Sequence, residues 1–157
     1  MAIAVRRATD EDAGTVAEFA IKLFSQHREY DADRFAKLDD VEGAAWFYAS
    51  RIAGETSSVL VVKLDGAVVG FAYLEYEAMN YADLLEDAVW LHDLFVAETA
   101  RRTGVGVELM KAALAEARRL RGQKLVLSVA AQNTAAMDFF KGLGFRTTMH
   151  EMTLELD

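Results

Sequence analysis

A short segment with two glycines and two arginines carries the clearest chemical signal in this sequence. Gly104 and Gly106 stand at the expected start of a helix, directly after Arg101 and Arg102. The first N–H groups of a helix lack intrahelical acceptors, and the helix dipole favours negative charge beside them. Glycine lets a ligand approach the backbone closely, and arginine adds charge-assisted hydrogen bonds. Residues 101–106 therefore predict a loop that binds phosphate.

This loop does not match the common nucleotide-binding patterns. A Rossmann fingerprint needs a third glycine where this chain has Leu109, and no Walker A motif occurs anywhere in the sequence. What remains is a strand, a short R-x-x-G-x-G loop and a helix, an arrangement that suits a pyrophosphate.

Two motifs together resemble the GNAT N-acetyltransferase superfamily. The segment LFVAETARRTGVGVELMKAAL resembles its R/Q-x-x-G-x-G/A loop, and NTAAMDFFKGLGF resembles its second signature segment. The matching positions are Arg101, Gly104 and Gly106 in the first motif, and Asn133, Ala136, Phe139, Phe140, Gly144 and Phe145 in the second. The resemblance covers essentially the whole chain. Within the superfamily, WLHDLFV and the chain length are most similar to the spermidine/spermine N-acetyltransferase-like branch.

The resemblance implies acetyl-CoA as co-substrate and an acetyl group transferred directly to a primary amine of a small molecule, polyamine-like or otherwise cationic. It places the pantetheine arm on the backbone of Leu94, Phe95 and Val96, and between strands four and five. The pyrophosphate would lie on Arg101, Arg102, Thr103, Gly104, Val105, Gly106 and Val107. Asn133 would contact the cofactor, cap the next helix, or do both. A homodimer is common in the superfamily.

Acetyl transfer requires a base, because an alkylamine is protonated at neutral pH. His92 and Asp93 are the candidate bases, and strand alternation predicts that they lie on opposite faces. An ordinary histidine pKa suits this role, although a partly buried histidine with a satisfied hydrogen bond is the alternative. Phe140 stands where the superfamily usually has a tyrosine that protonates the leaving thiolate. Tyr73 or Tyr76 could replace it, or the chain could be an acyl-CoA-binding regulatory module with weak or no catalysis.

The charge pattern concerns the second substrate. Residues 75–98 contain acids but no lysine or arginine, whereas residues 101–124 are mostly basic. These stretches are either two solvated faces or a cationic acceptor site beside an anionic cofactor site. Glu29, Tyr30 and Glu75 are the candidate acceptor residues.

Composition excludes several classes. The net charge of −8 argues against nucleic acid, and the chain has no cysteine and only three scattered histidines, so we expect no metal site. No apolar run is long enough for a membrane span and no secretory signal is recognisable, so we expect a cytoplasmic protein without membrane contact.

The elements that must position these residues alternate between strand and helix periods. We expect the order β-α-α-β-β-β-α-β-α-β in a single α/β domain over residues 1–157, with helices at 34–52 and 105–121, a hairpin at Asp65-Gly66 and a final strand after Gly144. The resemblance implies a GNAT-like fold: a mixed, mostly antiparallel twisted sheet flanked by helices, with strands four and five splayed apart.

Overall fold

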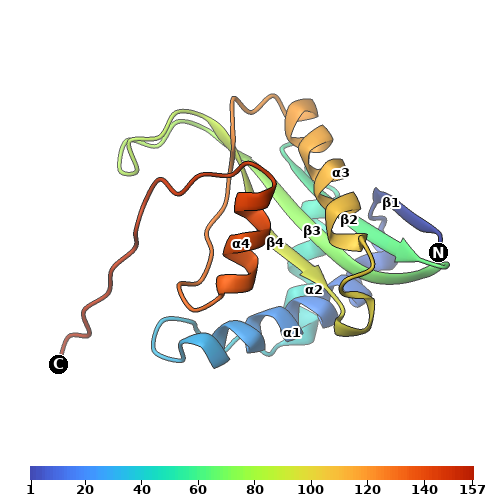
Figure 1. Cartoon of the computed structure of the whole chain (residues 1–157), viewed down its shortest axis with the longest axis horizontal. Coiled ribbons are helices and arrows are strands. Elements are labelled where there is room, and N and C mark those ends of the chain that lie inside the picture. Colours follow the sequence, from blue (N-terminus) through green and yellow to red (C-terminus); the bar gives the residue numbers. More distant parts are fainter.

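The computed structural model describes residues 1–157 and has a five-stranded sheet at its centre (Figure 1). The strands follow one another in sequence order: β1 (Ile3–Arg7), β2 (Ser57–Leu64), β3 (Ala67–Glu77), β4 (Ala88–Val96) and β5 (Leu125–Val126). The first three pairs of neighbours are antiparallel, and β4 and β5 are parallel. The expected mixed, mostly antiparallel sheet is confirmed.

Four helices accompany the sheet: α1 (Ala13–Tyr30), α2 (Val41–Ile52), α3 (Val105–Arg119) and α4 (Thr134–Gly142). Short 3-10 turns precede α1 (Asp10–Asp12) and α3 (Glu98–Ala100). The expected start of α2 at residue 34 was wrong, because Asp40 caps the helix by accepting a 3.1 Å hydrogen bond from the Gly43 amide. None of the helices combines the length and apolar character needed to cross a membrane.

The helices bury the two faces of the sheet separately. Helix α3 packs Leu109, Met110 and Ala113 against one face, which Leu60, Val62, Ala72 and Leu74 supply. Helices α1 and α2 cover the other face with Val16, Ala20 and Tyr48, against Val59, Val61, Phe71 and Tyr73. Alternate residues of the same strands therefore belong to different cores, as the two-residue strand period requires.

A tight turn and a bulge set the geometry of the central hairpins. Asp65 and Gly66 connect β2 to β3 with φ values of 51° and 89°, so the predicted hairpin turn is confirmed. Between β3 and β4, Tyr73 pairs with Asp93 while Leu74 pairs with Leu91, which leaves His92 as the extra residue of a β-bulge.

The last third of the chain is packed loosely. Strand β5 pairs with β4 only through Val89–Leu125 and Trp90–Val126, so β4 continues to Val96 without a neighbour on that side. This early separation confirms the expected splay. The expected final strand was wrong: residues 145–157 have no regular structure, and no residue after Ala117 is buried.

Candidate active site

The loop between β4 and α3 presents free backbone N–H groups at the start of a helix. Gly104, at φ 90°, caps α3 in the left-handed region that glycine adopts without a steric penalty. The first helical hydrogen bond joins the Glu108 amide to the Gly104 carbonyl at 3.1 Å. The amides of residues 102–107 have no acceptor within the protein. Consecutive free N–H groups at the positive end of a helix match the charge of a phosphate.

Two arginines border this loop and keep hydrogen-bond donors free for a ligand. Arg101 donates one hydrogen bond of 3.1 Å from Nε to the Val96 carbonyl, and its terminal nitrogens form no other bond. Arg102 is exposed, with φ of 63°. Thr103 donates its hydroxyl to the carbonyl of Ala100, which closes the turn. The structure thus groups residues 101–107 as the sequence predicted, and their binding of a pyrophosphate stays a prediction.

The end of β4 presents an open backbone edge next to this loop. Leu94, Phe95 and Val96 pair with β3 on one side and have no strand partner on the other. The side chain of Phe95 is buried in the core that α1 and α2 share. The Val96 carbonyl accepts the bond from Arg101, and a contact of this edge with pantetheine stays a prediction.

The bulge places the two candidate bases together. Strand alternation predicted opposite faces for His92 and Asp93, and this was wrong because His92 is the extra residue in β4. His92 stacks on Tyr73, with ring centroids 5.4 Å apart, and Tyr73 pairs with Asp93 across the strands. Both candidates therefore lie on the sheet face covered by α1 and α2.

Asp93 is held in an apolar, aromatic environment. Its Oδ2 accepts a hydrogen bond of 2.6 Å from the hydroxyl of Tyr48. Burial raises the pKa of Asp93 above its ordinary value, although the Tyr48 bond and the charges of His92 and His27 oppose the rise. A carboxylate with a raised pKa accepts a proton more readily than a solvated one.

His92 is partly exposed between two aromatic rings. Tyr73 stacks on one side, and Trp90 lies on the other with centroids 6.0 Å apart and planes at 14°. Its Nε2 lies 3.4 Å from Oε2 of Glu77. The imidazole is thus oriented by stacking and by one carboxylate, which favours the proton at Nε2 and leaves Nδ1 as the nitrogen with a free lone pair.

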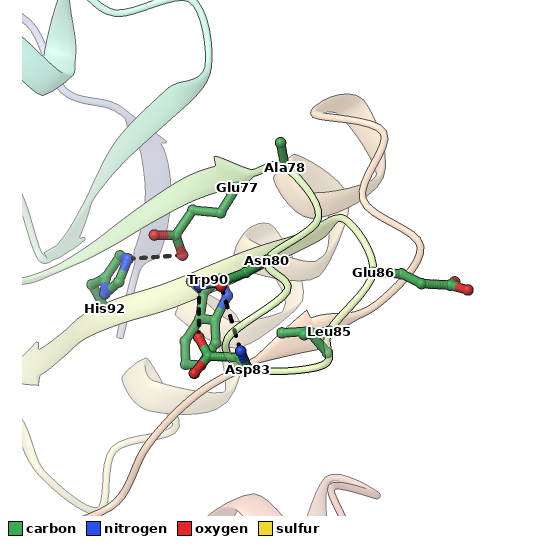
Figure 2. A pocket seen from close by; sticks show the side chains of 8 residues that line it. All are labelled: Glu77, Ala78, Asn80, Asp83, Leu85, Glu86, Trp90 and His92. Atoms are coloured by element: carbon green, nitrogen blue, oxygen red, sulfur yellow. Dashed lines mark hydrogen bonds and ion pairs between the residues drawn. The ribbon is translucent and has the colours of Figure 1, made fainter.

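A cavity of about 220 Å³ opens beside His92, where β3 ends and β4 begins. It is lined by Glu77, Ala78, Asn80, Asp83, Leu85, Glu86, Trp90 and His92, without a lysine or arginine. Figure 2 shows Glu77 and His92 pointing toward one another, whereas Glu86 points away from them. Asp83 is held by a 2.9 Å hydrogen bond from Asn80. Two carboxylates and the Trp90 ring suit a small organic cation.

The residues predicted to bind the acceptor amine do not line this cavity. Glu75 already accepts hydrogen bonds of 2.7 Å from Tyr73 and 3.0 Å from Thr56. Glu29 is exposed near the end of α1, and Tyr30 contacts His27 edge-on with centroids 5.9 Å apart. The structure does not bring Glu29, Tyr30 and Glu75 into the cavity, and an acceptor role for them stays a prediction.

Phe140 has an apolar environment and no proton to give. It packs edge-on against Phe139 and Phe145, with centroids 5.3 and 5.6 Å away. Tyr73 shares a face with His92, whereas Tyr76 packs against the core beneath α3. Burial is the main cause that raises the pKa of Tyr73 and of Tyr76. The hydroxyl of Tyr73 donates to Glu75 and that of Tyr76 to Asp87, so replacement of the missing hydroxyl by either tyrosine stays a prediction.

Asn133 has a structural role in addition to any contact with a cofactor. Its Oδ1 accepts a 3.1 Å hydrogen bond from the Ala136 amide, which starts α4. A Cβ added at Gly106 would lie 3.6 Å from Cζ of Phe139, so α4 packs close to the anion loop. The capping role is confirmed, and the cofactor contact stays a prediction.

The sequence did not identify Tyr48, His27, Glu77 or Trp90 as residues of the candidate site. Glu77 shares strand parity with Tyr73 and Glu75, so the alternation of β3 places all three on one face. Tyr48 and His27 come from helices, and their approach to Asp93 depends on packing that no local pattern encodes.

Comparisons with known proteins agree with this geometry. The model of the acetyltransferase (GNAT) family matches residues 20–145. An uncharacterized N-acetyltransferase of Methanocaldococcus jannaschii is 27% identical over 142 residues, which are 90% of this chain but only 59% of that relative. A protein of Bacillus halodurans has a TM-score of 0.85 at 24% identity, over 98% of this chain and 99% of its own. An aminoglycoside N-acetyltransferase in complex with CoA has a TM-score of 0.78 at 16% identity, over 99% and 95%.

Proposed function

Because the chain belongs to the acetyltransferase (GNAT) family, we propose that it transfers the acetyl group of acetyl-CoA to a primary amine of a small cationic molecule. The observation that carries this proposal is the juxtaposition of an anion-binding loop, an open strand edge and two candidate bases along β4. The relatives that support it are an N-acetyltransferase and a CoA-bound aminoglycoside N-acetyltransferase.

The donor side would hold acetyl-CoA, which supplies an activated acetyl thioester. The free amides of residues 102–107 fit its pyrophosphate, and Arg101 and Arg102 add positive charge. The open edge of Leu94, Phe95 and Val96 fits the amide groups of the pantetheine arm. These residues bind and orient, and none of them needs to change its protonation.

The acceptor amine must lose a proton as its nitrogen forms the new amide bond. The imidazole of His92 and the carboxylate of Asp93 lie on one face and can take that proton, directly or through water. The departing thiolate then takes a proton from solvent or from Tyr73, because Phe140 carries none. A coenzyme thiol leaves readily as thiolate, so a missing tyrosine slows this step without preventing it.

The cavity beside His92 would hold the cationic acceptor. Glu77 and Asp83 supply negative charge and Trp90 supplies an aromatic face. Such a site favours amines with a second positive charge over neutral or anionic amines.

The test is an assay of thiol release with acetyl-CoA and a panel of polyamines, aminoglycosides, amino acids and peptides. We expect turnover with dicationic or polycationic amines and thermal stabilisation by acetyl-CoA, on the order of 2.7 kcal/mol at a hundredfold excess over Kd. Stabilisation without turnover on any amine would favour the alternative that Phe140 suggests, an acyl-CoA-binding regulatory module. Absence of both would refute the family-based assignment of the cofactor.

A further inference from the structure

His27, in the last turn of α1, is a half-buried histidine without a role in the proposed reaction. Its Nδ1 lies 2.8 Å from the carbonyl oxygen of Leu23, which can only accept a hydrogen bond, so Nδ1 carries a proton. The rings of Tyr30 and Phe35 pack edge-on against the imidazole, with centroids 5.9 and 4.9 Å away. The position of the ring and its tautomer are therefore fixed, and Nε2 is the nitrogen left without a protein partner.

The face of α1 that carries His27 packs against β4. Phe19, two turns before His27 on the same face, lies against Phe95 with ring centroids 5.4 Å apart. Figure 1 shows α1 running in the direction opposite to the β4 arrow. From this contact, His27 is about 12 Å further along the helix. Asp93 is about 7 Å from Phe95 in the same direction along the strand. The register therefore brings His27 into the neighbourhood of Asp93.

The titratable groups that face Asp93 come from every element packed against it. They are Tyr48 of α2, Tyr73 of β3, His92 of β4 and His27 of α1. The two tyrosines are neutral, so only the imidazoles can carry a positive charge that favours the ionised carboxylate. His92 lies 3.4 Å from the carboxylate of Glu77 and shares its charge with it. His27 has no carboxylate at ion-pair distance, so its charge is available to Asp93.

We infer that His27 is a further positioning residue of the candidate site: in its protonated form it keeps Asp93 ionised, so that Asp93 can accept the proton of the acceptor amine. Histidine ordinarily changes its charge near neutral pH, so this support acts below neutral pH, where a buried carboxylate would otherwise take up a proton. The last turn of α1 favours the positive charge, because it is the negative end of the helix dipole. The inference rests on the proposed function for the use of Asp93 as a base, but the charge interaction exists without catalysis.

The first test measures the pKa of Asp93 by carbon-13 NMR of its carboxyl carbon, without substrate. His27→Gln should raise that pKa further, by roughly 0.5–1 unit, because the imidazolium is lost. His27→Lys keeps a positive charge and should bring the pKa back to the wild-type value or below. Both variants lose the ring contacts with Tyr30 and Phe35, so a merely structural role predicts the same result for both. His150→Gln, which removes an exposed histidine near the C-terminus, is the control and should change nothing.

A reciprocal measurement needs no substitution of His27. If the two groups interact, the ring resonances of His27 should titrate at lower pH in Asp93→Asn than in the wild type. An Asp93 pKa that His27→Gln leaves unchanged would overturn the inference. Ring resonances that titrate identically in Asp93→Asn and the wild type would overturn it as well, even where His27→Gln does not fold.

The pH profile of kcat adds the chemical readout once the assay of thiol release finds a substrate. In His27→Gln the acidic limb should move to higher pH by the same 0.5–1 unit, roughly, with little change on the alkaline plateau, and His27→Lys should reverse the move. A lowered plateau with an unmoved limb would assign His27 a structural role and overturn the inference. A shifted Asp93 pKa without turnover on any amine would support the charge interaction, while the proposed function would fail.

Discussion

The hydroxyl of Tyr48 donates a 2.6 Å hydrogen bond to Oδ2 of Asp93 and thereby ties α2 to the bulged strand β4. The bond stabilises the ionised carboxylate, but burial outweighs it and the pKa of Asp93 is raised. Ionisation of Asp93 therefore lowers the stability of the folded protein. Removal of this charge is therefore expected to raise stability and to lower activity.

Replacing Asp93 by Asn should stabilise the protein at pH 7.5 and slow the reaction. The pKa of Asp93 is higher in the folded protein than in the unfolded chain, so the native protein binds the proton more tightly. The stability of the wild type therefore falls as pH rises from the unfolded to the folded pKa of Asp93. Asparagine keeps an acceptor for Tyr48 and carries no charge. The difference in Tm between variant and wild type should be positive at pH 7.5 and shrink towards zero below pH ~4. A variant that is less stable at pH 7.5 would contradict this.

The same substitution tests the chemical role of Asp93. If Asp93 takes the proton of the amine, kcat should fall by roughly 10²- to 10⁴-fold with little change in the KM for acetyl-CoA. Tyr48→Phe is the companion variant, because it removes the donor, raises the pKa of Asp93 further and shifts the pH profile of kcat to higher pH. An unchanged kcat in Asp93→Asn would assign the base to His92.

Gly104→Ala should weaken cofactor binding and destabilise the protein. Alanine at φ 90° would be strained by about 1–2 kcal/mol, and relief of the strain would turn the amides of the anion loop. The KM for acetyl-CoA should rise while the KM for the amine stays near the wild-type value. Gly14→Ala is the matched control, because Gly14 lies in α1 with nothing within 4 Å of an added Cβ. It should leave both KM values unchanged and stabilise the helix by up to about 1 kcal/mol.

Glu77→Gln and Asp83→Asn should raise the KM for a dicationic amine and leave thermal stabilisation by acetyl-CoA unchanged. Each removes one of the charges that line the cavity, and the loss should correspond to roughly 5- to 10-fold in KM per carboxylate at low salt. The effect should decrease as ionic strength increases. Glu18→Gln, at an exposed position of α1, is the control for net charge. An equal effect of Glu18→Gln would refute a local acceptor site.

The sequence predicted the framework better than the site. Strand β4 and the start of α3 follow from apolar runs, glycine and capping residues, which are local signals. The sequence could not predict that His92 and Asp93 lie on the same face of the sheet. That position results from a bulge, and a bulge depends on the register between two strands. The C-terminal tail illustrates the converse. Its alternation predicts a strand, yet residues 145–157 pair with no strand of the sheet, and alternation alone cannot say whether an edge will be paired.

The last prediction concerns the buried carboxylate of Glu116, which joins α3 to the first two strands. It accepts hydrogen bonds from Arg7 at 3.0 Å, Arg119 at 2.8 Å and Ser58 at 2.7 Å. Burial alone would raise the pKa of Glu116, but the bonds from Arg119, Arg7 and Ser58 lower it to about 2. Glu116→Gln should therefore lower the free energy of unfolding by about 3 kcal/mol at pH 7, since two arginines lose their counter-charge.

The pH dependence of that loss identifies its cause. A depressed pKa stabilises the fold above the unfolded value of about 4.3, and the contribution is lost as pH falls from there towards 2. Urea unfolding should thus show a gap between wild type and Glu116→Gln that is full at pH 7 and smaller at pH 3. Glu108→Gln breaks an exposed 2.9 Å ion pair with Lys111 on the same helix and should cost less than about 0.5 kcal/mol at either pH. A Glu116→Gln gap that is independent of pH would mean that packing, and not the charge of the carboxylate, holds α3 to β1 and β2.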